Sequence, residues 1–309
     1  MSKVTVVGAG KYGSMTALRV AESDTASEVV MTDIVKGLPQ GLALDMNQSR
    51  YVEKFQTEII GTNSYKDTKD SDVVVVTAGL PRKPGMSRMD LLSTNGKIIK
   101  DVTNNIMEYS SSPIIIVVTN PLDQMTTLVA ETSDLPKKNV IGQAGILDSS
   151  RFAYFISKKT GVLMKDIKAL TLGSHGETMV PVSSQCLVNE KKLKEILTSK
   201  EIDELVEKTS KGGAEIVELL KTGSAYFAPA SAAAQMVNAI ITNSNNVLPV
   251  CAWMTGEYGI KDVYLGVTSR IGSNGVEEIV ELPLEQTEIE DLREASESVK
   301  LKVAELKDI

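Results

Sequence analysis

The fold is set by Val4-Thr5-Val6-Val7-Gly8-Ala9-Gly10-Lys11-Tyr12-Gly13, a short apolar run that leads directly into glycines spaced as G-x-G-x-x-G. Gly8 permits a tight turn from strand to helix, and Gly10 lets a pyrophosphate approach the free N–H groups at the start of that helix. Gly13 allows the helix to pack closely on the strand. Asp33 stands at the end of the next apolar run, where an acid binds ribose hydroxyls and repels a 2′-phosphate. The pattern therefore predicts a dinucleotide site that prefers NAD to NADP.

The first half of the chain alternates apolar runs with amphipathic segments. The runs of strand length cover residues 4–7, 29–32, 57–60, 73–77, 114–119 and 140–141. Several are aliphatic throughout, which is typical of strands buried on both faces of a parallel sheet. Amphipathic segments such as 13–21 and 93–109 lie between them. This order predicts an α/β fold whose N-terminal part is a doubly wound, parallel Rossmann sheet.

The second half predicts an α+β domain. Helical patterns run from about Asp148 to the C-terminal glycine Gly161, and over 191–211, 230–242 and 285–307. Strand patterns occupy 167–172, 263–267 and 276–282. We place the domain boundary near residues 142–145. An NAD-binding domain is therefore expected over 1–143, and a domain that binds substrate and carries the catalytic groups over 144–309.

The bulk composition excludes several classes of function. The chain of 309 residues has a formal net charge of −7, unlike the basic footprint of a nucleic-acid-binding protein. Its longest apolar runs have strand length, far below the roughly 20 residues of a membrane helix, and the N-terminal run is too short for a signal peptide. Two distant cysteines favour a reducing compartment. We expect a cytoplasmic protein with neither nucleic-acid nor membrane partners.

The chain has one histidine, His175, in the segment Gly173-Ser174-His175-Gly176. Histidine is the side chain that exchanges a proton near neutral pH, so acid–base chemistry with an imidazole has a single candidate. A metal site built on paired histidines is impossible within one chain. We therefore predict no metal.

Further candidates lie in three other segments. Asp148 and Arg151 are three residues apart at the head of a predicted helix and share a face. Arg82 and Arg88 flank a stretch that a proline and a glycine break, and Asn120 precedes Pro121 at the carboxyl end of a predicted strand, where open α/β sheets bind ligands. Considered alone, each has an ordinary explanation as a surface ion pair, a solvated basic loop or a turn.

Taken together and in this order, the segments resemble the lactate/malate dehydrogenase family. The resemblance covers essentially the whole chain and is closest to the malate-type members of the lactate-dehydrogenase-like branch. It rests on Gly8-Ala9-Gly10-x-x-Gly13, Asp33, Pro81-Arg82-Lys83-Pro84-Gly85-Met86-Ser87-Arg88, Thr119-Asn120-Pro121, Gly145-Ile146-Leu147-Asp148-x-x-Arg151 and Gly173-Ser174-His175-Gly176.

The resemblance implies a role for each candidate. His175 would be the proton donor and acceptor at the substrate C2 oxygen, with Asp148 hydrogen-bonded to its other ring nitrogen. Arg151 would hold the C1 carboxylate, and Arg88 would polarise the C2 carbonyl. Asn120 would orient the substrate oxygen and contact the nicotinamide. The resemblance also implies that the cofactor is NAD, bound by Gly8, Gly10, Gly13, Asp33, Asn95 and Asn120.

Arg82 would decide the substrate. In lactate-type relatives the matching position is typically Gln, whereas an arginine can pair with a second carboxylate. A monoacid would leave that guanidinium unpaired in the closed site, at a cost of about 2–5 kcal/mol. The resemblance thus implies reversible hydride transfer between (S)-malate and oxaloacetate, in a homodimer or homotetramer. Two alternatives stay open: a dehydrogenase of lactate or another 2-hydroxy acid, and a non-catalytic NAD-binding sensor. A serine hydrolase is disfavoured because the G-x-S-x-G motif is absent.

Overall fold

A computed structural model describes residues 2–80 and 88–308, without the side chains of residues 88, 307 and 308. Arg82 and the side chain of Arg88 therefore lie outside the described residues. The first half forms β1 (Lys3–Val7), α1 (Lys11–Glu22), β2 (Glu28–Thr32), α2 (Leu38–Glu53), β3 (Glu58–Thr62), β4 (Val73–Val76), α3 (Arg88–Tyr109), β5 (Ile114–Val117), α4 (Leu122–Thr132) and β6 (Val140–Gly142).

The first six strands form a parallel sheet in the order β3-β2-β1-β4-β5-β6. This is the doubly wound order that the sequence predicts. Strand β4 shows why its residues do not alternate with polar ones. Val73 and Val75 pack in one apolar cluster with residues of α1, whereas Val74 and Val76 pack in a second cluster with residues of α3 and α4. Both faces of the strand are buried.

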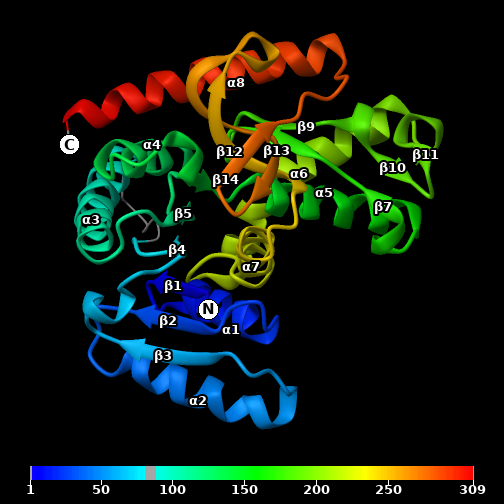
Figure 1. The fold of residues 1–309 in the computed structure, drawn as a ribbon. Helices are drawn as coiled ribbons and strands as arrows, with labels where there is room; N and C mark the ends of the chain where they lie inside the picture. The colour runs from blue at the N-terminus through cyan, green and yellow to red at the C-terminus, as the bar shows by residue number, and fades with distance from the viewer. Residues whose placement is uncertain (1, 81–87, 309) are drawn as a thin grey trace.

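Most strands of the second half join this sheet, and the other three form a small separate sheet. The elements of this half are α5 (Gly145–Thr160), β7 (Ile167–Lys168), β8 (Thr171–Gly173), β9 (Met179–Pro181), β10 (Leu187–Val188), β11 (Lys191–Lys192), α6 (Ser199–Leu220), α7 (Phe227–Ile241), β12 (Asn246–Thr255), β13 (Lys261–Gly272), β14 (Gly275–Ile279) and α8 (Gln286–Ala304). The small sheet has the order β11-β10-β7. Strand β12 pairs antiparallel with β6 through Cys251 and Gly142, and β13, β8 and β9 follow. Helix α8 covers β13 and reaches α4 (Figure 1).

The predicted helix over 191–211 is wrong at both ends. Residues 191–192 form strand β11, and α6 begins at Ser199. The start is fixed by a capping box in which the Thr198 side chain accepts from the backbone of Glu201, and the Glu201 carboxylate accepts from the backbone of Thr198. The helix then continues through Gly212 and Gly213 to Leu220. Glycine usually disfavours a helix interior, but here it lets α6 approach α5.

Two strand predictions also differ from the structure. The segment 167–172 divides between two sheets, with β7 in a three-stranded sheet and β8 in the large one. Strand β12 was not predicted, because Pro249 in its centre argues against an inner strand. Pro249 pairs with Thr268 of β13, whereas β12 meets β6 only at Cys251. In the part of the chain that the structure describes, no helix has the length and apolar character to cross a membrane.

Candidate active site

The carboxyl ends of the strands bring distant candidate residues to one edge of the sheet. Gly8 follows β1, Asp33 follows β2 and Asn120 lies shortly after β5. Gln143 follows β6 and His175 lies shortly after β8. Because β1, β2, β5 and β6 are parallel, they end at the same edge, and the residues that follow them gather there although some lie more than a hundred positions apart. Strand β8 is antiparallel to these strands, so His175 does not follow this rule and is instead held at the site by its contact with Asp148.

A cavity of about 360 Å³, the cofactor cavity, lies at the start of α1. Gly8 takes a φ of +102°, which L side chains rarely adopt. A Cβ built on Gly10 would meet nothing within 4 Å, whereas one on Gly13 would overlap the carbonyl oxygen of Gly8. The backbone at the helix N-terminus is therefore open over Gly10 and tightly packed below Gly13. Room for a pyrophosphate exists where the sequence predicts it.

Asp33 lines the same cavity and is held by the backbone. Its carboxylate accepts hydrogen bonds from the N–H groups of Ala9 at 2.7 Å and Val35 at 2.9 Å. Each carboxylate oxygen has a second lone pair, so acceptor capacity remains for ribose hydroxyls. Ile34 lines the cavity beside it and is 95% exposed, which is unusual for a large apolar side chain. The cavity thus offers polar contacts for ribose and phosphate and an apolar contact for a base, and it fits a dinucleotide.

His175, Asp148 and Arg151 meet in one hydrogen-bonded group. His175 Nδ1 lies 2.8 Å from Asp148 Oδ2, and Arg151 Nη1 donates to Asp148 Oδ1 at 2.9 Å. Asp148 is 1% exposed and lies in the first turn of α5, whose dipole favours a negative charge there. Within the described residues, His175 Nε2 has no hydrogen-bond partner. The ring is therefore fixed through one nitrogen and presents the other.

The surroundings of His175 favour its charged form. Burial lowers the pKa of the imidazole, but the charge and hydrogen bond of Asp148 act against it, and the net result is a pKa above the usual value. Arg151 opposes this increase and Asp123 adds to it. A raised pKa suits a group that must hold a proton near neutral pH and then release it.

A cavity of about 290 Å³, the active-site cavity, adjoins this group. It is lined by Tyr12, Val118, Asn120, Gln143, Leu147, Arg151, His175, Gly176, Met179, Ser210, Gly213, Val217, Ser224, Ala225 and Pro229. Among the described residues, three buried side-chain polar atoms lack a hydrogen-bond partner, and two of them, Arg151 Nε and Gln143 Nε2, are in residues that line this cavity. Unpaired buried donors are costly, so the cavity is built to receive acceptor groups.

The structure separates the two predicted asparagines. Asn120 lines the active-site cavity, as expected for a ligand contact. Asn95 is buried behind the cavity wall and lines neither cavity. Its amide accepts from Leu80 N–H at 2.8 Å and donates to the carbonyl oxygen of Asn120 at 2.7 Å. Asn95 thus fixes the chain around Leu80 and Asn120.

Sequence reasoning missed several residues of the site. Asp123 is buried beneath His175, accepts its backbone N–H at 3.2 Å and receives the Cys251 thiol at 3.4 Å. Burial raises the pKa of Asp123. Gln143 could have been found, because it follows an apolar strand just as Asn120 does. Gly213 has no such signal, since its role is to bring α6 against the Arg151 guanidinium.

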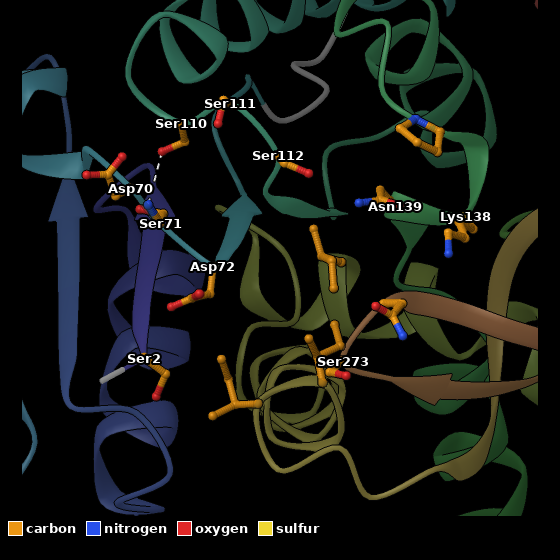
Figure 2. Close-up of a pocket in the computed structure, with 15 residues that line it drawn as sticks. Ser2, Asp70, Ser71, Asp72, Ser110, Ser111, Ser112, Lys138, Asn139 and Ser273 are labelled. Atoms are coloured by element: carbon orange, nitrogen blue, oxygen red, sulfur yellow. Dashed lines mark hydrogen bonds between the residues drawn. The ribbon is translucent and has the colours of Figure 1, made fainter.

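A larger cavity, of about 670 Å³, lies at the opposite ends of the strands and contains none of these residues. We call it the amino-end cavity, because most of its lining precedes β1, β4, β5 and β6. Figure 2 shows its hydroxyl and carboxylate groups, with Ser71 N–H donating to Ser110 Oγ at 3.1 Å. Ser110 Oγ in turn donates to the carbonyl oxygen of Thr68. None of the unpartnered atoms named above lines this cavity.

Comparison with known proteins agrees with this geometry. Residues 2–142 match the lactate/malate dehydrogenase NAD binding domain, and residues 146–308 match the alpha/beta C-terminal domain of the same family. A malate dehydrogenase of Trichormus variabilis is 51% identical over 97% of this chain and 92% of its own length. The structure of malate dehydrogenase from Salinibacter ruber superimposes with a TM-score of 0.95 at 42% identity, covering 99% of this chain and 98% of that one.

The solved relatives also include a lactate dehydrogenase. The Cryptosporidium parvum enzyme, crystallised with lactic acid and nicotinamide adenine dinucleotide, has a TM-score of 0.95 at 39% identity and covers 100% of this chain and 98% of that one. The two family models together span nearly the whole sequence. Among the described residues, the motifs that carry the resemblance contribute to the lining of two adjoining cavities through Gly8, Gly10, Gly13, Asp33, Asn120, Arg151 and His175. The chain belongs to the lactate/malate dehydrogenase family.

Proposed function

We propose that this chain is an NAD-dependent malate dehydrogenase, which transfers hydride reversibly between (S)-malate and oxaloacetate. The observation that carries the proposal is the group formed by His175, Asp148 and Arg151 at the active-site cavity, next to the cofactor cavity. Tyr12 lines both cavities, so a dinucleotide in one would place its reactive end near the other. NAD supplies the hydride acceptor when it is bound.

The chain's own residues handle the proton and the charges. His175 Nε2 takes the proton of the malate hydroxyl during oxidation and returns it to the C2 oxygen during reduction. Asp148 holds the ring through Nδ1 and stabilises the imidazolium. Arg151 binds the C1 carboxylate with the guanidinium donors that Asp148 leaves free. A non-catalytic sensor would have no use for this combination.

The preference for a diacid rests on Arg82. This residue and the side chain of Arg88 lie outside the described residues, so both assignments rest on the sequence. Arg82 pairs with the second carboxylate, and Arg88 stabilises the negative charge that develops on the C2 oxygen. Relatives of both substrate types share this fold, so the fold does not select the substrate.

NADH oxidation tests the function directly. We expect turnover with oxaloacetate and much less with pyruvate or 2-oxoglutarate, and NADH should be preferred to NADPH because of Asp33. In Arg82→Gln, oxaloacetate kcat/KM should fall by about 30-fold to several-thousand-fold while the ratio of pyruvate to oxaloacetate use rises. An unchanged ratio would refute the role of Arg82. An unaltered protein that binds NADH but reduces none of the three acids would refute the function.

We further propose domains at 1–143 and 144–309, a boundary that the extents of the two family matches support. A homodimer or homotetramer is consistent with the apolar side chains exposed on α2, namely Leu44, Tyr51 and Val52. Light scattering after size exclusion would measure the assembly. We also propose a cytoplasmic location, which two free, buried cysteines support because they are typical of a reducing compartment.

A further inference from the structure

Tyr12, at the third variable position of the glycine motif, lies between the two cavities. No role was predicted for it from the sequence. Its side chain lines both the cofactor cavity and the active-site cavity. The phenol oxygen lies 3.2 Å from Gln143 Oε1 and 3.0 Å from the carbonyl oxygen of Pro229, and these two acceptors share its single hydrogen. Burial raises the pKa of Tyr12, so the group stays a neutral donor. These contacts join α1, the end of β6 and the start of α7.

Gln143 is the residue that these contacts orient. It is 3% exposed, and its backbone N–H donates to Val117 O at 2.9 Å. The amide oxygen receives the Tyr12 hydrogen, but among the described residues the amide nitrogen has no partner. A buried donor without an acceptor costs about 1–3 kcal/mol. Gln143 lines the active-site cavity together with Arg151 and His175. Such an arrangement is expected where a ligand completes the hydrogen bond.

We propose that Gln143 Nε2 donates a hydrogen bond to an sp² oxygen of the bound ligand and that Tyr12 is the positioning residue that turns this nitrogen towards the cavity. The inference rests on the proposed function, because that function supplies two ligands with such an oxygen. One is the carboxylate of the diacid and the other is the carboxamide of the nicotinamide. In the structure the Tyr12 O–H donates to Oε1, which leaves Nε2 as the amide atom available to a ligand.

The test compares three variants: Gln143→Met, which removes the donor and keeps the length, Gln143→Glu, which replaces the donor by an acceptor, and Tyr12→Phe, which removes only the hydroxyl. The NADH dissociation constant is measured by fluorescence without substrate, and oxaloacetate KM and kcat are measured separately. If the partner is the carboxylate, KM in Gln143→Met rises about 10- to 100-fold. If it is the carboxamide, the NADH constant rises about 3- to 10-fold.

Two further results separate a positioning role from a structural one. Tyr12→Phe should weaken the same constant by a smaller factor, and adding it to Gln143→Met should have no further effect, because both changes remove one interaction. Gln143→Glu should weaken binding at least as much as Gln143→Met. The matched control is Gln185→Met, whose amide nitrogen is already bonded to Pro283 O outside both cavities. It should leave both constants unchanged.

Several outcomes would overturn this inference without touching the proposed function. If Gln143→Met still reduces oxaloacetate with unchanged KM and unchanged NADH binding, Gln143 makes no hydrogen bond to the ligand. Tight binding by Gln143→Glu would mean that the side chain presents an acceptor instead of a donor. Additive effects of Tyr12→Phe and Gln143→Met would show that Tyr12 does not act through Gln143. The fluorescence measurement needs no turnover, so it tests the carboxamide as the partner of Gln143 even if oxaloacetate is not the substrate.

Discussion

The active-site cavity and the amino-end cavity lie at opposite ends of the same parallel strands and differ in how their polar groups are satisfied. The amino-end cavity is more than twice as large, at about 670 Å³ against 290 Å³. Its buried hydroxyls bond to the backbone: Ser110 Oγ accepts from Ser71 N–H and donates to the carbonyl oxygen of Thr68. The smaller cavity is lined by Arg151 and Gln143, whose buried Nε and Nε2 atoms have no partner among the described residues. Unmatched buried donors, rather than volume, mark the end of the sheet that binds a ligand.

The largest loss is expected when the proton carrier is removed. His175→Asn keeps a polar side chain of similar size but cannot exchange a proton near neutral pH. We expect oxaloacetate reduction and malate oxidation to fall by about 10²- to 10⁴-fold in kcat, with NADH binding nearly unchanged. Steady-state kinetics in both directions measure this. Near-normal turnover would show that the proton takes another route.

Arg151→Gln should have the next largest effect. The variant removes the guanidinium and leaves the buried Asp148 carboxylate with one charged partner fewer, at a cost of about 2–5 kcal/mol in substrate binding and turnover. Oxaloacetate kcat/KM should fall by about 30-fold or more.

The matched control is Arg270→Gln, whose ion pair with Glu278 lies on the surface. Exposed pairs of this kind contribute about 0–1 kcal/mol, so activity should be retained. Equal losses in the two arginine variants would mean that the active-site cavity has no special need for Arg151.

Asp148→Asn should move the pH dependence of the reaction. Reduction needs the protonated imidazole, and Asp148 acts to raise the pKa of His175 against the effect of burial. Without that charge burial remains, so the pKa falls and reduction is lost at lower pH than in the unaltered chain. At pH values above the pKa of His175 in both proteins, each unit by which this pKa falls lowers the fraction of imidazolium about tenfold. Malate oxidation, which needs the neutral ring, should conversely extend to lower pH.

The pH profiles of kcat/KM in the two directions check the role of Asp148. If the pH profile of Asp148→Asn keeps the same apparent pKa while activity falls equally at all pH values, Asp148 orients the site without changing the ionisation of His175. The mirrored shift of the two limbs distinguishes a change in the ionisation of His175 from a loss of correctly folded protein.

The smallest effect is expected at the amino-end cavity. Lys138 is an exposed cation on its lining, so Lys138→Gln removes a charge without opening the core. Surface substitutions of this kind usually change stability by about 0.5 kcal/mol or less, and kcat/KM should stay within about twofold. A large change in kcat/KM would mean that the larger cavity takes part in the reaction, and the contrast between the two ends of the sheet would fail.

Much of this contrast could be predicted from the sequence. The aliphatic strands, the glycine motif with Asp33, and the segment containing Asp148 and Arg151 are local patterns. The structure brings the segments that follow β1, β2 and β5 to one edge, as a parallel sheet requires, whereas His175 follows the antiparallel strand β8 and meets this edge through Asp148. The contact between Tyr12 and Gln143 could not be predicted, because it joins residues 131 positions apart through one hydroxyl. Strand β12 could not be predicted because Pro249 argues against an inner strand. The full extent of α6 could not be predicted because it contains two glycines, whose small size allows close packing against Arg151.

A crystal structure with NADH and (S)-malate, a pair that cannot react with each other, would locate the substrate relative to His175. We expect one malate carboxylate against the Arg151 guanidinium, the C2 hydroxyl within hydrogen-bond distance of His175 Nε2, and no malate in the amino-end cavity. Malate bound at the amino-end cavity, or bound at the carboxyl ends of the strands without contact to His175, would contradict the proposed site.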